Sequence, residues 1–251
     1  MIDLARFNNE VLSAAHANGN PLDLEHRKVA RPWELSPSGL RAHVDGLREA
    51  GVTFVASEWG VPDLDALAAM EDVDVVTVVR EPVARIVSNF GFDYLRGFTE
   101  ATSIEEYVDH HCDTHTQTDY YTRMILGAAY RIDGDSAMQV AEVARRLQLV
   151  RYVGVLEDPA WISGLSDALN WQAAPVAAKS SNLGAVQRGI RVIRQLGRGR
   201  LDLAIRAFGA APHVGPESRE WLAERNATDL RVYSRLASDS TRASDELRSD
   251  P

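Results

Sequence analysis

The stretch from Val73 to Gly97 constrains the fold more than any other part of the chain, because a valine-rich run passes directly into a proline-marked helix start. The run predicts a strand buried on both faces, as the strands of parallel sheets are, and it ends at Arg80. Pro82 suits the first position of a helix, where its missing N–H costs nothing. The apolar residues that follow at helical spacing are Ile86, Phe90 and Leu95. Arg80 is therefore expected at the carboxyl edge of a sheet, where open α/β folds bind ligands.

The flanking segments extend this stretch into a βαβ pattern. Residues 52–60 predict a short buried strand whose carboxyl end presents Glu58, and residues 63–70 predict a crossover helix. A strand, a helix and a second strand in this order indicate an α/β protein with a parallel sheet flanked by helices. A third strand is expected over residues 150–157, and it ends in Glu157.

Further helices are predicted from apolar residues at helical spacing and from capping residues. They cover residues 4–16, 36–50, 102–108, 120–127, 135–149, 158–170 and 217–236. Residues 21–37 are polar, contain proline and predict a loop. Residues 238–251 lack a hydrophobic stripe and predict a disordered tail, so we expect one α/β domain over residues 1–237.

Charge and cysteine content narrow the class of protein. The net charge of -9 and the pI of about 5.3 argue against broad nucleic-acid binding, for which a basic surface is expected. Cys112 is the single cysteine, which excludes an intrachain disulfide and fits a reducing compartment. Residues 1–10 have neither a basic start nor an apolar core, and no apolar run approaches membrane-spanning length. We therefore expect a cytoplasmic protein without an integral membrane segment.

The segment from Arg80 to Ser88, Arg-Glu-Pro-Val-Ala-Arg-Ile-Val-Ser, resembles a nucleotide-binding motif. It is similar to the 3'-phosphate-binding motif of sulfotransferases that use 3'-phosphoadenosine 5'-phosphosulfate (PAPS). The resemblance implies that Arg80 and Ser88 hold the 3'-phosphate of PAPS, which would be the co-substrate. The pairing is physically reasonable, because a guanidinium forms a charge-assisted fork with phosphate oxygens and a hydroxyl adds a neutral donor. The alternative is an arginine and a serine that are both satisfied locally.

Other segments match the bacterial and carbohydrate sulfotransferases in the same order. Residues 8–12 resemble the helix after the phosphosulfate loop of that family, and Ser57-Glu58 resembles the end of its second strand. Residues 153–157, Val-Gly-Val-Leu-Glu, are similar to a later strand. Asn226, Asp229 and Tyr233 fall where a late helix carries these residue types. The resemblance implies a P-loop NTPase-like sulfotransferase fold with a central parallel sheet.

The chain departs from this family in its first motif. The family begins with a strand and a Lys-Thr-Gly-Thr-like loop that binds the 5'-phosphosulfate, and no such loop occurs in this sequence. Lys28 and Lys179 lie in contexts unsuited to replace its lysine. Met1 falls near the end of the expected loop, so the first strand and loop would lie upstream of it. The alternatives are a missing upstream segment and a protein that has lost the loop and most of its catalytic ability.

Sulfuryl transfer needs a base for the acceptor hydroxyl, and it does not need a metal. Glu58 is the candidate, because a carboxylate at the carboxyl end of a strand beside that of Arg80 would face the same crevice. The alternatives are that Glu58 pairs with an arginine, such as Arg80, or caps the helix that begins near Asp63. His26 and His43 are further candidate bases.

Two clusters leave other chemistry open. Asp109, His110, His111, Cys112, Asp113 and His115 invite a zinc interpretation, but they lie within seven residues and have no second ligand pair at a familiar spacing. The arginines from Arg188 to Arg206 form either a basic wall for the nucleotide or a solvated helix face.

The expected function is therefore transfer of a sulfuryl group from PAPS to a hydroxyl of a carbohydrate or small metabolite. The alternative is a catalytically inactive nucleotide-binding or interaction module on the same fold. A P-loop kinase is disfavoured because the sequence has no Walker loop. The acceptor and the oligomeric state do not follow from the sequence.

Overall fold

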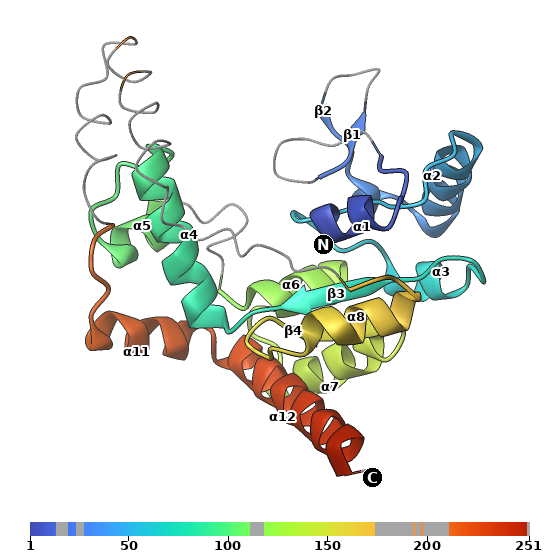
Figure 1. Cartoon of the computed structure of the whole chain (residues 1–251). Helices are drawn as coiled ribbons and strands as arrows, with labels where there is room; N and C mark the ends of the chain where they lie inside the picture. Colours follow the sequence, from blue (N-terminus) through green and yellow to red (C-terminus); the bar gives the residue numbers. More distant parts are fainter. Residues whose placement is uncertain are drawn as a thin grey trace. The chain divides into compact units, whose positions relative to one another are not determined.

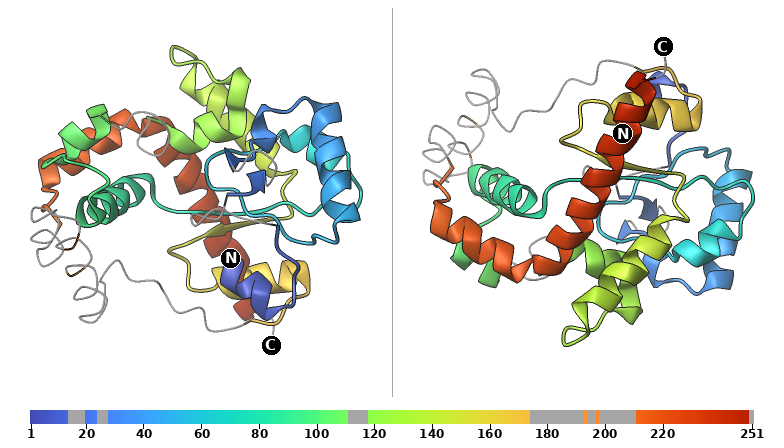
Figure 2. Two further views of the ribbon diagram at one scale, coloured as in Figure 1. Left: turned by 90° about the horizontal axis from the view of Figure 1, so that it is seen from above. Right: turned by 90° about the horizontal axis from the view of Figure 1, so that it is seen from below.

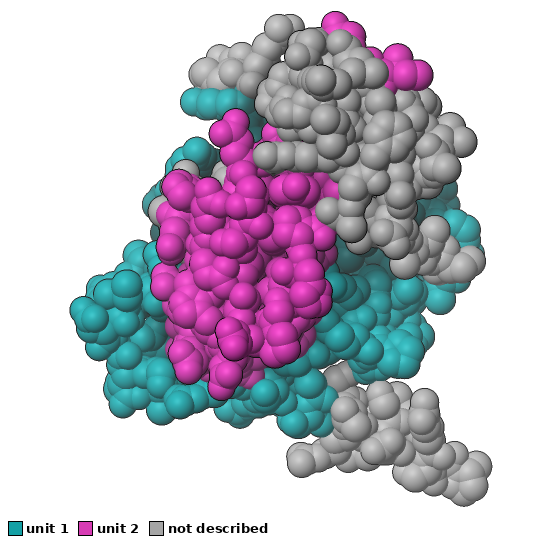
Figure 3. All heavy atoms as spheres, turned by 90° about the vertical axis from the view of Figure 1, so that its left-hand side faces the viewer, with its two compact units in different colours: residues 1–80, 121–176, 231–251 teal, residues 81–120, 177–230 magenta. Residues whose placement is uncertain are grey.

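The computed structural model describes residues 1–13, 20–23, 28–110, 118–173, 193, 197 and 211–249. The chain divides into two compact units, which Figure 3 distinguishes by colour. The first unit comprises residues 1–80, 121–176 and 231–251, and the second comprises residues 81–120 and 177–230. The expected single domain over residues 1–237 stays a prediction. Among the described residues, no helix is both long and apolar enough to cross a membrane.

The sheet of the first unit is the parallel pair β3 (Val76–Val79) and β4 (Tyr152–Val155). Val76 lies opposite Tyr152 and Val79 lies opposite Val155, so the strands end level with each other (Figure 1). The predicted parallel pairing is confirmed for these strands. The larger central sheet of a sulfotransferase fold stays a prediction.

Helices cover both faces of this pair, because successive side chains of β4 point to opposite sides. Tyr152 faces α8 (Trp161–Leu169) and donates a hydrogen bond of 2.8 Å to the carbonyl of Trp161. Val153 packs on the other face against a core that includes Ile125 of α6 (Tyr120–Leu126) and Val143 of α7 (Ser136–Leu147). Figure 2 shows α8 on one side of the strands and α6 with α7 on the other. The predicted arrangement of a parallel sheet flanked by helices is confirmed at this level.

Side-chain caps explain where several helices begin. Ser36 precedes α2 (Pro37–Glu49) and accepts a hydrogen bond of 3.2 Å from the N–H of Gly39. Asp63 caps α3 (Leu64–Ala68) by accepting from the N–H of Ala66 at 3.0 Å. Asp135 caps α7 in the same way. Each side chain satisfies a backbone N–H that has no partner within its helix.

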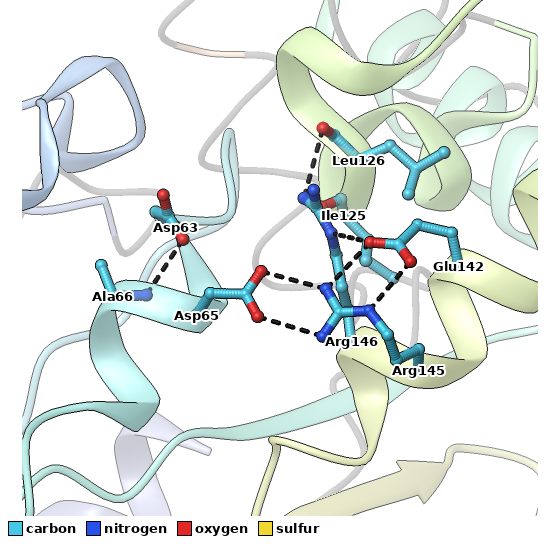
Figure 4. A network of polar contacts seen from close by, with 8 residues as sticks. All are labelled: Asp63, Asp65, Ala66, Ile125, Leu126, Glu142, Arg145 and Arg146. Atoms are coloured by element: carbon cyan, nitrogen blue, oxygen red, sulfur yellow. Dashed lines mark hydrogen bonds and ion pairs between the residues drawn. The ribbon is translucent and has the colours of Figure 1, made fainter.

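An ion network joins α3 to α7 and α7 to α6 (Figure 4). Arg145 donates to both carboxylate oxygens of Asp65 at 3.1 Å and to both oxygens of Glu142 at 2.9 Å. Arg146 donates to Glu142 at 3.0 Å and to the carbonyl of Ile125 at 2.8 Å. The hydrogen bonds from the two arginines lower the pKa of Glu142 from 4.5 to about 2.

We expect Glu142→Gln to make the protein less stable near neutral pH and to have little effect in acid. The pKa of Glu142 is lowered by folding, so its contribution is present above the ordinary value of 4.5 and is lost as the pH falls to about 2. The side chain of Glu142 is 38% exposed and its ion pairs are screened by water, so the difference in unfolding free energy should be no more than about 1 kcal/mol. Urea denaturation of both proteins across this range measures it. A difference that grows as the pH falls would contradict the assignment.

Two predicted elements of the first unit are wrong in part or in whole. The helix predicted over residues 4–16 ends early, because α1 is Ile2–Phe7 and Asn9 has a left-handed backbone with φ 61°. The strand predicted over residues 52–60 does not form, and only an isolated parallel bridge between Leu12 and Phe54 is found in the described part of this region. The N–H groups of Thr53 and Phe54 both donate to the carbonyl of Val11, at 2.9 and 3.1 Å. Long-range pairing therefore replaces local helix formation after Phe7.

Two further segments differ from the prediction. The expected loop over residues 21–37 contains an antiparallel pair, β1 (Leu22–Asp23) with β2 (Lys28–Val29), and the short 3-10 helix η1 (Pro32–Glu34). The helix predicted from Asp158 begins later, at Trp161, because Asp158 uses its side chain to accept from the N–H of Ala160 in a turn.

The second unit is built around α4 (Pro82–Arg96), which begins at Pro82 as predicted and ends at Gly97 with φ 66°. It packs against α5 (Ile104–His110) and α11 (Pro216–Arg225). The core residues are Val83, Ile86, Phe90, Ala101, Ile104, Tyr107, Val108, Val214 and Leu222. Tyr107 is fully buried in this core, and its hydroxyl donates to Asp93 at 2.6 Å.

The predicted helical region over residues 217–236 is divided at Asn226 into α11 and α12 (Ala227–Ser249). Asp119 holds the start of α12, because its carboxylate accepts from the N–H groups of Thr228 at 3.2 Å and Asp229 at 3.1 Å. Asn226 in turn accepts from the N–H of Asp119 at 3.1 Å. Helical backbone continues to Ser249, within the segment for which we predict a disordered tail, and the tail boundary stays a prediction.

Candidate functional site

The carboxyl ends of β3 and β4 bring a cation and a carboxylate to the same edge of the sheet. Arg80 directly follows β3, and Glu157 follows β4 after one intervening residue. The Nε atom of Arg80 lies 3.9 Å from Oε1 of Glu157, and the two side chains are 38% and 39% exposed. The predicted position of Arg80 at the end of a parallel strand is thus confirmed, and Glu157 is its neighbour.

Two tyrosines complete this group. The backbone N–H of Arg80 donates to the hydroxyl of Tyr121 at 2.9 Å, and the hydroxyl of Tyr233 donates to Oε2 of Glu157 at 3.1 Å. We call Arg80, Tyr121, Glu157 and Tyr233 the edge cluster. Sequence reasoning missed Tyr121, because a tyrosine at the start of a helix carries no signal for a contact with a strand end.

The guanidinium of Arg80 has unused donors within the described part of the chain. Its terminal nitrogens make no hydrogen bond to the described residues, and its ion pair with Glu157 is long. Arg151 lies at the amino-terminal ends of the same two strands. It instead donates to both carboxylate oxygens of Asp74 at 2.9 Å. Arg80 therefore keeps the capacity to bind an anion through a fork of two N–H groups.

The start of α4 is already occupied by a carboxylate of the chain itself. Glu81 accepts hydrogen bonds from the N–H groups of Val83 and Ala84, which are the amides that would otherwise attract an anion. A phosphate near this turn would consequently depend on side chains. Ser88 lies within α4, is half-buried, and makes no side-chain hydrogen bond to the described residues. Joint binding of one phosphate by Arg80 and Ser88 stays a prediction, because the two residues belong to different units.

The loop that carries Glu58 is held by a buried side chain. Oδ1 of Asn20, which is fully buried, accepts from the N–H groups of Glu58 at 2.8 Å and Trp59 at 2.9 Å. The hydroxyl of Ser57 donates to the carbonyl of Gly60 at 2.7 Å. A Cβ atom at Gly60 would lie 2.1 Å from the ring of Trp33, so this position requires glycine. The backbone of Glu58 is therefore fixed, although no regular strand leads to it.

The chemistry of Glu58 is compatible with a base. The residue is exposed overall, yet the protein atoms around its carboxylate displace enough water to raise its pKa. The cap of α3 is the carboxylate of Asp63 itself, so Glu58 is not needed for that alternative role. The catalytic role of Glu58 stays a prediction.

The segment that resembles the helix after the phosphosulfate loop has another structure here. Glu10 accepts a hydrogen bond of 2.9 Å from the indole of Trp171 with one oxygen and a hydrogen bond from Thr53 with the other. Asn8 and Gln172 exchange two hydrogen bonds, at 2.7 and 3.1 Å. These contacts join the chain after α1 to two distant segments of the first unit, so their evident role is structural.

The other candidate residues belong neither to the edge cluster nor to the Glu58 loop. His26, Lys179, residues 111–117 and the arginines from Arg188 to Arg206 lie outside the described residues. His43 lies in α2, where burial lowers its pKa. Within the described ranges, no group of three or more His, Cys, Asp or Glu side chains is placed to hold a metal ion.

Comparisons with known proteins do not assign the chain to a family. No family, no curated protein and no solved structure matches the chain.

Proposed function

We propose that the chain is a PAPS-dependent sulfotransferase that transfers a sulfuryl group to a hydroxyl of a carbohydrate or small metabolite. One observation carries the proposal. Arg80 stands at the carboxyl edge of a parallel strand pair, and its terminal guanidinium nitrogens make no hydrogen bond to the described residues. An arginine at this position of an α/β fold suits the recognition of a phosphate.

In this proposal Arg80 and Ser88 bind the 3'-phosphate and Glu58 is the base. The acceptor oxygen attacks the sulfur of PAPS, and the bond between sulfur and the bridging oxygen of the 5'-phosphate breaks. The acceptor proton passes to Glu58, whose raised pKa favours taking it up. The products are the sulfate ester and 3'-phosphoadenosine 5'-phosphate (PAP). Binding, orientation and proton transfer are the tasks of the protein, and the step needs no metal.

A second candidate is a nucleotide-binding module that transfers no sulfate. This candidate needs only Arg80 and its neighbours, and not the Lys-Thr-Gly-Thr-like loop, which is absent from residues 1–251. Both candidates use Arg80 in the same way, so nucleotide binding does not separate them. Incubation with PAPS and a panel of sugars and phenols does, because the sulfotransferase releases PAP and the module does not.

We expect the wild-type protein to bind PAP about tenfold more tightly than adenosine 5'-phosphate. The two nucleotides differ in the 3'-phosphate, and hydrogen bonds to a charged group contribute about 1.5–3 kcal/mol each. Isothermal titration calorimetry with both nucleotides measures the ratio. Equal affinities, or no binding of PAP, would refute the proposed function.

A further inference from the structure

Two contacts of Glu157 use different carboxylate oxygens, one toward a cation and one toward a hydroxyl. Oε1 faces Nε of Arg80 at 3.9 Å, and Oε2 accepts from Tyr233 at 3.1 Å. A charge-assisted bond between a guanidinium and a carboxylate has a length of about 2.7–2.9 Å. Glu157 therefore stands about 1 Å beyond closed contact with Arg80.

Solvent exposure does not explain this separation. Arg151 and Asp74 are in direct hydrogen-bond contact at 2.9 Å at the amino-terminal ends of the same strands. Their side chains are 46% and 51% exposed. The Arg80 and Glu157 side chains are less exposed than these and nevertheless stand apart. Among the contacts of the described residues, the carboxylate of the edge cluster also accepts from a tyrosine hydroxyl, and that of Asp74 does not.

Tyr233 is well placed to hold this carboxylate. It lies in α12 next to Val232, which is 4% exposed and packs in the core with residues of α6 and α7. The helix therefore fixes the position from which the hydroxyl reaches Glu157. A carboxylate that closed on Arg80 would occupy the N–H groups that an incoming phosphate needs, and it would compete with that phosphate.

We propose that Tyr233 is a positioning residue that keeps Glu157 from closing on Arg80, and so keeps the guanidinium available to the 3'-phosphate. The inference rests on the proposed function, because it concerns the same phosphate site. It assigns to the tyrosine an effect on affinity that acts entirely through the charge of Glu157.

A double-mutant cycle tests this role, with PAP as the ligand and calorimetry as the measurement. We expect Tyr233→Phe to weaken PAP binding by about fivefold, since Glu157 can then close on Arg80. We expect Glu157→Gln to strengthen binding by about twofold to fivefold, because the competing charge is removed while an oxygen remains for the tyrosine. In the Glu157→Gln background, Tyr233→Phe should have no further effect.

Tyr152→Phe is the matched control, because its hydroxyl donates to the carbonyl of Trp161 in the same unit and does not touch Glu157. It should leave PAP affinity unchanged while lowering thermal stability. An equal loss from Tyr233→Phe in both backgrounds, or weaker binding by Glu157→Gln alone, would overturn the positioning role. If the wild-type protein does not prefer PAP to adenosine 5'-phosphate, the proposed function fails instead.

Discussion

Arg80→Ala is expected to weaken the binding of PAP by about 100-fold. The substitution removes the guanidinium fork, and two hydrogen bonds to a charged group contribute about 1.5–3 kcal/mol each, of which part is recovered from water. It also leaves Glu157, formerly 3.9 Å from the arginine, beside the phosphate as a charge of the same sign. The effect should therefore exceed that of deleting the 3'-phosphate from the ligand, which leaves Arg80 with its carboxylate neighbour.

Arg151→Ala provides the matched control for this measurement. It also removes an arginine side chain from this strand pair, but at the amino-terminal ends of the strands. There Arg151 donates to Asp74 and to the carbonyl of Ala168. PAP affinity should be unchanged in this variant. Equal affinities of Arg80→Ala and the wild-type protein in calorimetry would remove Arg80 from the site.

Elements that depend on local chemistry could be predicted from the sequence. The strand before Arg80 and the helix after it follow from a valine run and from Pro82, and both are found as β3 and α4. The cap at Asp63 likewise depends on residues within one turn of the helix start. In each case the deciding interactions lie within a few residues, so a pattern in the sequence contains them.

The region after Phe7 could not be predicted, because distant partners decide its structure. Apolar spacing favours a helix there, but Val11 pairs with the backbone of residues 53 and 54. Glu10 also bonds Trp171, which is 161 positions away in the sequence. Helix propensity contributes at most about 1 kcal/mol per residue, and such tertiary contacts routinely override it. Nothing in the local pattern signals them.

The candidate site likewise contains residues whose positions follow from the sequence pattern and residues whose positions do not. Arg80 and Glu157 could be placed at one edge, because both follow parallel strands and parallel strands end on the same side. The tyrosine hydroxyls at positions 121 and 233 could not, since each reaches its partner from a helix that the sequence does not dock onto the sheet. The position of Glu58 was expected from a strand, and a hydrogen-bonded loop fixes it instead.

Asn20→Ala should test whether that loop is held as the structure indicates. The substitution removes the acceptor of the N–H groups of Glu58 and Trp59 from a fully buried position. Loss of a buried partner costs about 1–3 kcal/mol, so we expect urea denaturation to show about 2 kcal/mol less stability. Backbone amide hydrogen exchange should accelerate at Glu58 and Trp59, because both N–H groups become free to exchange.

The matched control is Asn8→Ala, which removes another asparagine with long-range hydrogen bonds, here two exposed ones to Gln172. It should cost less stability and leave exchange at Glu58 and Trp59 unchanged. If Asn20→Ala destabilised the protein without faster exchange at these two amides, the loop would be held by other contacts. If exchange does accelerate and the rate of PAP formation from PAPS falls while PAP affinity is kept, Glu58 acts in the transfer step and not in nucleotide binding. That split between rate and affinity separates the base assigned to the loop from the phosphate site assigned to Arg80.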